Sequence, residues 1–294
     1  MEFLAPSGGS VYLDGTVGGG GHSAILLDEC TSCRVIAVDR DPDALEVART
    51  TLAPFGDRVR LVAARFDEAL SSVRLSEPLA GVLLDLGVSS HQLDSDQRGF
   101  AFRSGVDLDM RMDATQADSP SAARVLNSEP EEELARIFHE YGEEPRSRGL
   151  ARAVVERRGA TPFRTSDDLV AVLYRTLGRA PRAKEKARIF QALRIAVNEE
   201  LTCLENSLEQ FREAMAPDAR MVVISYHSLE DRLVKNAFRD WSRSCVCPPG
   251  MPICTCRGEP LGSVLTRKAV RPSDVEVRRN PRARSARLRA WSKR

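Results

Sequence analysis

The sequence predicts an α/β protein with a largely parallel sheet and a helical insertion within it. Over the first hundred residues, short apolar segments alternate with helical patterns, a rhythm that is typical of βαβ units. About ninety residues of helical pattern follow, and strand character returns near residue 220. We therefore predict a core formed by residues 1–106 and 201–294, with a helical insertion at 107–200.

Strands in the first part are predicted where short apolar runs are bounded by polar or glycine residues. One helix between them begins at Pro42, because proline is favoured in the first turn of a helix. Ala44, Leu45 and Ala48 then recur at helical spacing. The predicted strands are 11–14, 34–38, 59–62 and 80–85.

The predicted insertion contains two segments with the residues of capped helix starts, at 128–131 and 165–168. A later helix places Phe190, Leu193 and Val197 on one face. Beyond it we expect a strand, a helix from about Ser228, a cysteine-rich loop and two further strands. These three strands are predicted at 220–225, 263–270 and 285–292.

A glycine-rich loop follows the first predicted strand. Residues 18–21 are all glycine, so the backbone here can approach a ligand closely. Asp14 ends the preceding strand, and Asp39 ends the next one, where a carboxylate can bind ribose hydroxyls. Ser23 stands where the G-x-G-x-x-G pattern of dinucleotide sites requires its third glycine. Asp14 instead suits a cofactor with a cationic amino-acid portion, such as S-adenosylmethionine; a flexible loop without a ligand is the alternative.

Composition indicates a cytoplasmic protein with a sizeable core. Of its 294 residues 42% are hydrophobic, and no apolar run approaches the length of a membrane span. The first residues lack the basic-then-apolar pattern of a secretory signal. The seven cysteines cluster in a way that indicates metal ligation rather than a disulfide framework.

Positive charge is concentrated near the end of the chain, although the formal net charge is only +1. Residues 267–294 contain eleven Lys and Arg, with Asp274 and Glu276 as the acids. Such a segment is typical of contact with phosphate backbones, and a solvated tail or a core strand is the alternative. The expected phosphate contacts are Arg282, Arg284, Arg287 and Arg289.

The segment 85–92, Asp-Leu-Gly-Val-Ser-Ser-His-Gln, follows the fourth predicted strand. In a parallel sheet this strand end faces a bound ligand. The carboxylate of Asp85, the hydroxyls of Ser89 and Ser90, and the amide of Gln92 could orient an amine beside a cofactor. An ordinary strand-ending turn is the alternative interpretation.

Two single residues admit both a functional and a structural interpretation. Phe66 follows the third strand and could pack on an adenine ring, although core packing is favoured by this residue alone. His227 lies between a strand and a helix and could shuttle a proton or contact phosphate. Ser228 and Asp231 have capping-box spacing, which favours a local hydrogen-bonding role for this histidine.

Two Cys-x-Cys pairs lie within twelve residues near the end of the chain. Four thiolates are a ligand set of tetrahedral zinc, and the proline-rich loop between the pairs would let them converge. The spacing is tighter than the usual Cys-x-x-Cys, so a structural metal and free reduced thiols both stay open. The pairs are Cys245 with Cys247 and Cys254 with Cys256, whereas Cys30, Cys33 and Cys203 show no comparable arrangement.

Ordered motifs run through the whole chain. They are Asp-Gly-Thr-Val-Gly-Gly-Gly-Gly-His-Ser (14–23), Ala-Val-Asp-Arg-Asp-Pro (37–42), Leu-Leu-Asp-Leu-Gly-Val-Ser-Ser (83–90), Arg-Gly-Phe-Ala-Phe (98–102), Leu-Asp-Met-Arg-Met-Asp (108–113), Phe-Gln-Ala-Leu-Arg-Ile-Ala-Val-Asn (190–198), Ser-Tyr-His-Ser-Leu-Glu-Asp-Arg (225–232) and Asn-Pro-Arg-Ala-Arg-Ser-Ala-Arg-Leu-Arg (280–289). Together they resemble the bacterial ribosomal RNA small subunit methyltransferase H family. That family transfers a methyl group from S-adenosylmethionine to N4 of a cytosine in the decoding region of 16S rRNA.

The resemblance implies a Rossmann-like S-adenosylmethionine-dependent methyltransferase core (class I) with an inserted helical domain. It implies 16S rRNA within the small ribosomal subunit as the partner, and a homodimer stays open. For direct transfer to the exocyclic amine, Asp85 is the first candidate proton acceptor and Ser89 the second. The cofactor contacts that the resemblance implies are Gly20, Gly21, His22, Asp39, Phe66, Asp85 and Gln92.

The chain departs from this family pattern at several places. The segment before the first strand is short, and Lys-Glu-Lys-Ala at 184–187 replaces the usual His-Pro-Ala-Thr. Ala101 and His91 stand where Ser and Pro are common. The alternative functions are a DNA amino-methyltransferase, a non-catalytic RNA assembly factor that binds the cofactor and, least favoured, a nicotinamide dehydrogenase.

Overall fold

The computed structural model describes the chain except for residues 90, 91, 94, 116–118, 248–250, 252, 254 and 257. It divides into two compact units, which we describe separately. The first unit joins Met1–Gly87 to Thr202–Arg294, and the second comprises Val88–Leu201.

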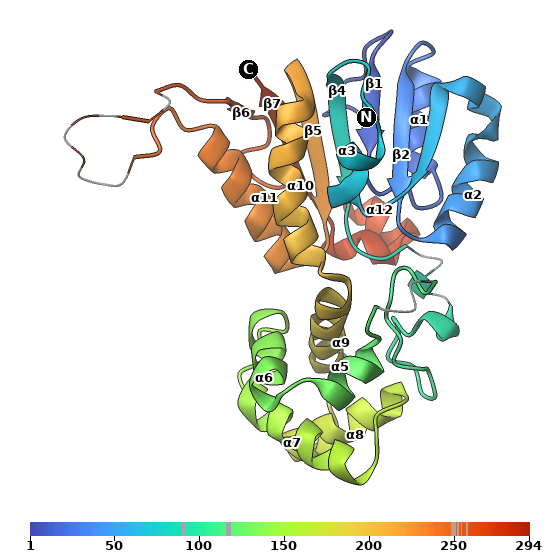
Figure 1. Ribbon diagram of the computed structural model, residues 1–294, viewed down its shortest axis with the longest axis vertical. Coiled ribbons are helices and arrows are strands. Elements are labelled where there is room, and N and C mark those ends of the chain that lie inside the picture. Colours follow the sequence, from blue (N-terminus) through green and yellow to red (C-terminus); the bar gives the residue numbers. More distant parts are fainter. Residues whose placement is uncertain are drawn as a thin grey trace. The chain divides into compact units, whose positions relative to one another are not determined.

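A seven-stranded sheet forms the centre of the first unit within the described residues, in the order β3-β2-β1-β4-β5-β7-β6 (Figure 1). Strands β3, β2, β1, β4 and β5 pair in parallel, whereas β7 runs antiparallel to both β5 and β6. The strand order reverses between β1 and β4, which is the point where open α/β sheets bind ligands. The strands are β1 Val11–Asp14, β2 Arg34–Asp39, β3 Val59–Ala63, β4 Leu79–Asp85, β5 Met215–Ser225, β6 Gly262–Val264 and β7 Arg287–Lys293.

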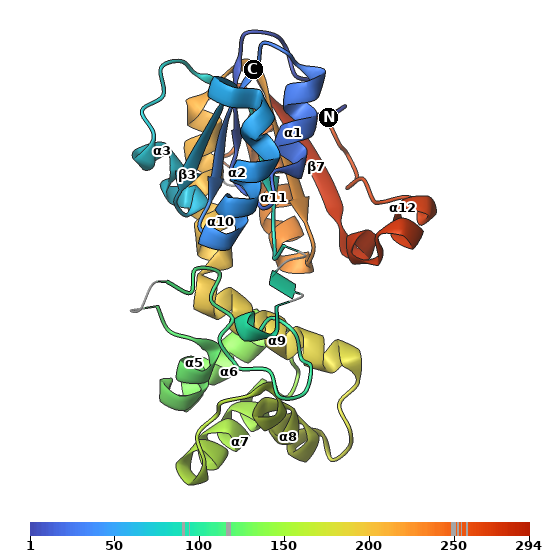
Figure 2. The same cartoon turned by 90° about the vertical axis from the view of Figure 1, so that its right-hand side faces the viewer.

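Helices cover both faces of this sheet, as the βαβ rhythm predicts (Figure 2). On one face, Phe211 of α10 and Phe238 of α11 pack with Trp291 of the last strand. On the other face, Leu27 of α1 and Ala48 of α2 pack in a separate apolar cluster. The helices are α1 Gly21–Glu29, α2 Pro42–Leu52, α3 Ala69–Ser72, α10 Glu200–Ala214, α11 Ser228–Trp241 and α12 Asp274–Arg279.

The strand predicted at 263–270 is only three residues long in the structure. The chain nevertheless continues beside β7, because Leu265 donates a backbone hydrogen bond to Ala290 at 2.9 Å. Val270 and Leu288 form an isolated antiparallel bridge farther along. The apolar pattern therefore identified a segment that follows the sheet edge but does not form a continuous ladder.

The second unit is a helical bundle around its own apolar core. Phe138, Phe163, Leu193 and Val154 are among its buried residues. The helix start predicted at Thr165 has both hydrogen bonds of a capping box with Asp168. The helices are α5 Ala122–Ser128, α6 Glu131–Glu140, α7 Ser147–Ala160, α8 Ser166–Leu177 and α9 Ala183–Asn198.

The first boundary of the second unit lies at Gly87/Val88, whereas the sequence prediction placed it at 106/107. The intervening segment contains little regular secondary structure, so no periodic pattern assigned it to either part. Its apolar side chains decide the matter: Phe100 is buried in the helical core, and Val88 and Phe102 pack against that core.

The last strand uses part of the basic segment for structural contacts. Arg287 and Arg289 of β7 donate hydrogen bonds to the carboxylate of Asp231 in α11, at 3.0 and 2.6 Å. The structural alternative is therefore favoured for these two arginines, which neutralise a largely buried acid. Arg282 and Arg284, in contrast, are exposed on the turn before the strand.

This arrangement predicts a larger loss of stability for Asp231→Asn than for Asp240→Asn in the same helix. Arg289, whose side chain is only 12% exposed, would lose its charged partner, at a cost of roughly 2 kcal/mol. Asp240 pairs with Arg239 in solvent, so its replacement should cost less than about 0.5 kcal/mol. Urea unfolding of the full chain measures the change in unfolding free energy for both variants. Equal changes would contradict the assignment.

The same pair has a defined pH dependence. Burial alone would raise the pKa of Asp231, but hydrogen bonds from Arg289 and Arg287 outweigh it, so the pKa lies below its ordinary value. The stabilisation is thus present above the unfolded-state pKa and is lost as pH falls through the folded-state pKa. The stability difference between wild type and Asp231→Asn should shrink over that acidic range.

Candidate active site

Three carboxylates lie at the carboxyl ends of adjacent parallel strands. Asp14 ends β1 and pairs in register with Ala37 of β2 and Leu83 of β4. Asp39 and Asp85 therefore extend two residues farther along their strands than Asp14 does. Asp14 is therefore set back from the sheet edge, between Asp39 and Asp85, at the point where the strand order reverses.

Asp14 is buried and holds the start of the following loop and helix. Its carboxylate accepts a hydrogen bond from the Ser23 hydroxyl at 2.6 Å and from the Thr16 amide at 3.2 Å. Burial raises its pKa, and these two hydrogen bonds partly oppose that effect. Asp14 thus holds the glycine loop in position, and its carboxylate is not exposed.

The glycine loop needs glycine at defined positions. Gly18 and Gly20 have φ angles of 51° and 86°, in the left-handed region that favours glycine. Gly20 is also the N-cap of α1, and a Cβ atom there would lie 3.1 Å from the Leu52 side chain. Gly21 is different, because it is exposed and a Cβ atom there would meet nothing within 4 Å. The loop therefore leaves open space beside the first turn of the helix.

Asp39 is half-buried and ties the glycine loop to the second strand. Its two oxygens accept backbone hydrogen bonds from Gly18 and Asp41, each at 2.9 Å. A carboxylate offers about four acceptor positions, so it can still accept hydrogen bonds from two hydroxyl groups. Burial raises the pKa of Asp39, and the two amide hydrogen bonds oppose it.

Asp85 lies at a junction of three elements. Its backbone amide donates to the Thr16 hydroxyl at 2.6 Å, which fixes the strand end against the loop. One carboxylate oxygen accepts the Tyr226 hydroxyl at 3.1 Å, and the other lies 3.5 Å from His22 Nδ1. Burial raises the pKa of Asp85, although His22 and Tyr226 oppose it. The carboxylate is therefore more basic than an exposed aspartate and better suited to accept a proton.

Phe66 begins a short 3₁₀ helix, Phe66–Glu68, directly after β3 and the turn that follows it. It is half-buried, and its Cβ atom lies 3.4 Å from the place that a Cβ on Gly15 would occupy. The ring thus combines packing against the sheet core with a position beside the glycine loop. Both interpretations given for Phe66 from the sequence fit this placement.

Ser89 and Gln92 belong to the second unit and contact one another. The Ser89 amide donates to Gln92 Oε1 at 2.8 Å, and the Gln92 amide donates to the Ser89 hydroxyl at 3.2 Å. Ser90 and His91, which lie between them in the sequence, are outside the described residues. Within the first unit, His22 lies beside Asp85, and Gly20 and Gly21 directly precede it in the glycine loop. Asp39 contacts the same loop through Gly18, and Phe66 lies next to it at Gly15.

His227 has a structural role. It is the N-cap of α11, and its Nδ1 accepts the Glu230 amide at 3.4 Å. Glu230 in turn accepts the Tyr226 amide at 2.9 Å, so the cap lies one residue earlier than the Ser228–Asp231 spacing predicts. This arrangement orients Tyr226 towards Asp85. Sequence analysis did not select Tyr226, because its contact spans 141 positions and leaves no local pattern.

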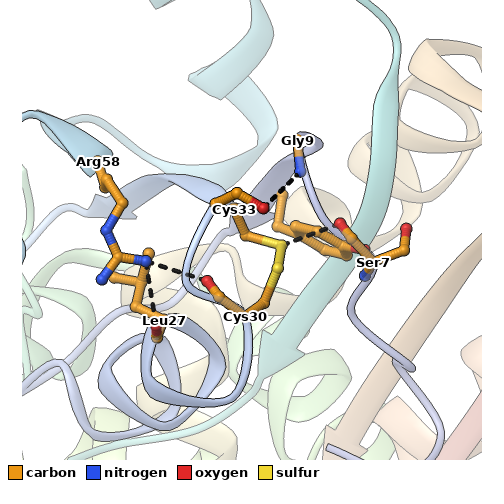
Figure 3. The surroundings of a disulfide bond; sticks show 8 residues. Ser7, Gly9, Leu27, Cys30, Cys33 and Arg58 are labelled. Atoms are coloured by element: carbon orange, nitrogen blue, oxygen red, sulfur yellow. Dashed lines mark hydrogen bonds between the residues drawn. A yellow bond between two sulfur atoms is a disulfide. The ribbon is translucent and has the colours of Figure 1, made fainter.

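The described cysteines other than Cys203 fall into two arrangements. Sequence analysis favoured metal ligation over a disulfide framework and found no comparable arrangement for Cys30 and Cys33. The structure instead joins these two cysteines by a disulfide, with Cα atoms 5.4 Å apart (Figure 3). The bond closes the turn between α1 and β2, where Arg58 donates to the carbonyls of Leu27 and Cys30. In the cysteine-rich loop, the sulfur atoms of three cysteines lie within 4.8 Å of one another. They are Cys245, Cys247 and Cys256, while Cys254 is outside the described residues.

The first-unit residues fit a cofactor that carries positive charge and vicinal hydroxyls. Burial raises the pKa of Asp14, Asp39 and Asp85, so a cation nearby would stabilise their ionised forms. Gly21 leaves room for close approach, and Asp39 keeps acceptor capacity for hydroxyls. S-adenosylmethionine has both features, because its sulfonium and amino groups are cationic and its ribose is free.

Within the part of the chain that is described, no helix has the length and apolar character needed to span a membrane.

Comparison with known proteins gives a consistent result over the full chain. The model of the MraW methylase family matches residues 1–294. A ribosomal RNA small subunit methyltransferase H from Gemmatimonas aurantiaca is 50% identical over 286 residues, covering 96% of this chain and 89% of that protein. One of the same name from Heliobacterium modesticaldum is 46% identical over 300 residues, covering 100% and 95%. A solved rRNA methylase from Streptococcus thermophilus has 12% identity and a TM-score of 0.42, covering 99% and 90%.

The glycine loop geometry predicts opposite results for two neighbouring substitutions. Gly20→Ala would force a left-handed residue to carry a Cβ and crowd Leu52, which should cost roughly 1–2 kcal/mol of unfolding free energy. Gly21→Ala has open space and lies at the first position of α1, so its effect should stay within about 0.5 kcal/mol. Thermal and urea unfolding measure both. Equal destabilisation by the two variants would show that the loop has another conformation.

Proposed function

Because the chain belongs to the MraW methylase family, we propose that it transfers the methyl group of S-adenosylmethionine to N4 of a cytosine in the decoding region of 16S rRNA. The protein is an S-adenosylmethionine-dependent methyltransferase, and its first unit is a Rossmann-like core of class I, as the sequence predicts. The names of its close relatives specify ribosomal RNA of the small subunit. The observation that carries the proposal is the group of strand-end acids around an open glycine loop.

The proposed cofactor contacts follow from the positions of these residues. Asp39 binds the ribose hydroxyls with its remaining acceptor positions, and Phe66 packs against adenine. Gly20, Gly21 and His22, at the start of α1, hold the amino-acid portion. Gln92 is a further proposed contact from the second unit. When bound, the cofactor supplies an electrophilic methyl group on a positively charged sulfur.

Asp85 is the proposed proton acceptor for the amine. The exocyclic amine of cytosine is a poor nucleophile, because its lone pair is delocalised into the ring. A hydrogen bond from the amine to Asp85 would favour a more pyramidal nitrogen and align it with the methyl group. Tyr226 and His22 hold the carboxylate from two sides, and the Thr16 contact fixes the backbone. Ser89 is the second candidate acceptor.

Of the four arginines expected to contact phosphate, we retain only the two that are exposed in the basic segment 267–294. Arg282 and Arg284 remain candidates for phosphate contact, because both are exposed. We propose the small ribosomal subunit in the cytoplasm as the substrate, since surrounding RNA gives a decoding-region loop its shape. The base must leave any stack to reach Asp85. A homodimer stays a prediction.

The proposed function predicts a specific modified nucleoside. Unmodified small ribosomal subunits incubated with the protein and methyl-labelled S-adenosylmethionine should yield labelled N4-methylcytidine, detected by nucleoside mass spectrometry. Heat-inactivated protein and subunits that already carry the modification are the controls. Label on another nucleoside would retain methyl transfer and reject the proposed target. Cofactor binding without any label would favour the non-catalytic RNA assembly factor.

The proposed role of Asp85 predicts a loss of turnover without loss of the fold. Asp85→Asn should lower the methylation rate constant roughly 10²- to 10⁴-fold, because an amide is a far weaker proton acceptor. The exposed acid Glu68, in the short helix of Phe66, provides the control variant Glu68→Gln, which should retain wild-type turnover. Single-turnover kinetics measure both. Near-normal turnover by Asp85→Asn would transfer the role to Ser89 or to a backbone carbonyl.

The same assignment fixes the sign of the pH dependence. The accepting form of Asp85 is the ionised one, and burial raises its pKa above the ordinary value of 3.8. The wild-type rate should therefore fall as pH decreases through this raised pKa, at a higher pH than an exposed aspartate would give. The residual activity of Asp85→Asn should lack this acidic limb.

A further inference from the structure

The cysteine-rich loop between α11 and β6 is long and has little apolar material to hold it. Its ends are joined by a backbone hydrogen bond from Leu261 to Trp241 at 2.8 Å, so the loop leaves the sheet edge and returns to it at one place. The described residues between these ends belong to no helix or strand. Ile253 is 73% exposed and Met251 is also exposed. Hydrophobic burial therefore does not hold the described residues of this loop in place.

Sulfur atoms converge within this loop. The Sγ atoms of Cys245, Cys247 and Cys256 all lie within 4.8 Å of one another. Cys245 and Cys247 belong to the first arm of the loop, and Cys256 belongs to the second. Three thiolates bound to one zinc ion in tetrahedral geometry, each at about 2.3 Å, lie about 3.8 Å apart. The observed arrangement is thus close to the metal-bound one, and only small side-chain movements separate the two.

A backbone amide is directed at one of these sulfur atoms. The Val246 amide donates to Cys256 Sγ at 3.3 Å, across the two arms. Such donors stabilise negative charge on sulfur and fix its orientation, as the hydrogen bonds around metal-bound ligands do. The two arms of the loop are therefore joined by a backbone donor at a sulfur atom.

We propose that Cys245, Cys247 and Cys256 bind a zinc ion, which joins the two arms of the cysteine-rich loop. Zinc suits the site because it binds soft thiolate ligands readily. It also has no redox chemistry, which suits a purely structural role. Each thiol releases its proton to solvent as its sulfur bonds to the metal, so zinc affinity rises with pH. The site lies outside the residues proposed for methyl transfer, and the inference does not depend on the proposed function.

Metal analysis of the full-length protein tests this site. Protein purified under reducing conditions without chelators, loaded with zinc and then desalted, should retain one zinc ion per chain by mass spectrometric elemental analysis. Cys245→Ser, Cys247→Ser and Cys256→Ser should each lose most of it. Thr255→Ala, which changes the same loop without removing a thiol, should retain it. Zinc retained by the serine variants, or no zinc bound by reduced wild-type protein, would overturn the assignment.

Two measurements on the wild-type protein avoid any dependence on variant folding. Replacement of zinc by Co²⁺ should produce thiolate-to-cobalt charge-transfer absorption, and its absence would exclude sulfur ligation. Removal of zinc with a chelator should increase proteolytic cleavage within 242–261 several-fold, and added zinc should reverse it. Cleavage that is unaffected by zinc, or a disulfide among these cysteines in anaerobically prepared protein, would also contradict the proposal.

Discussion

The register of three parallel strands, β2, β1 and β4, is the constraint on which the site depends. It places Asp14 between Asp39 and Asp85 and sets it back by two residues. Burial raises the pKa of all three, so their ionised forms need compensation from the surrounding structure. A shift of one residue in either strand pairing would turn a carboxylate to the other face of the sheet and dismantle the group.

The loop after β1 provides that compensation through backbone and side-chain donors. The amide of Gly18 donates a hydrogen bond to Asp39, and the hydroxyl of Ser23 donates one to Asp14. Thr16 accepts the amide of Asp85 and so connects the loop to the other side of the site. Left-handed glycines allow the loop to make these contacts while its outer surface at Gly21 stays open. The same segment therefore supports the acids and leaves room for a cationic cofactor, which would complete their compensation.

Local patterns predicted the strand ends, and with them Asp39 and Asp85, because a parallel sheet fixes where such residues lie. Contacts that join distant segments could not be predicted in this way. Tyr226 meets Asp85 through tertiary packing alone, and Asp231 meets Arg289 across 58 positions. Charge counting could not separate Arg289, which pairs with an acid, from exposed Arg284. The boundary at Gly87/Val88 also depended on packing, since the following irregular segment has no periodicity.

Helix α11 connects the candidate active site with the cysteine-rich loop, and its packing fixes it to the sheet between them. At its start, Glu230 holds the turn that directs Tyr226 to Asp85. At its end, Trp241 packs against Trp291 of β7 with ring centroids 5.1 Å apart, before the loop begins. Asp231 and this aromatic contact both fix the helix to the sheet between the site and the loop. Zinc would then organise a surface of the protein, while the acids at the strand ends set its chemistry.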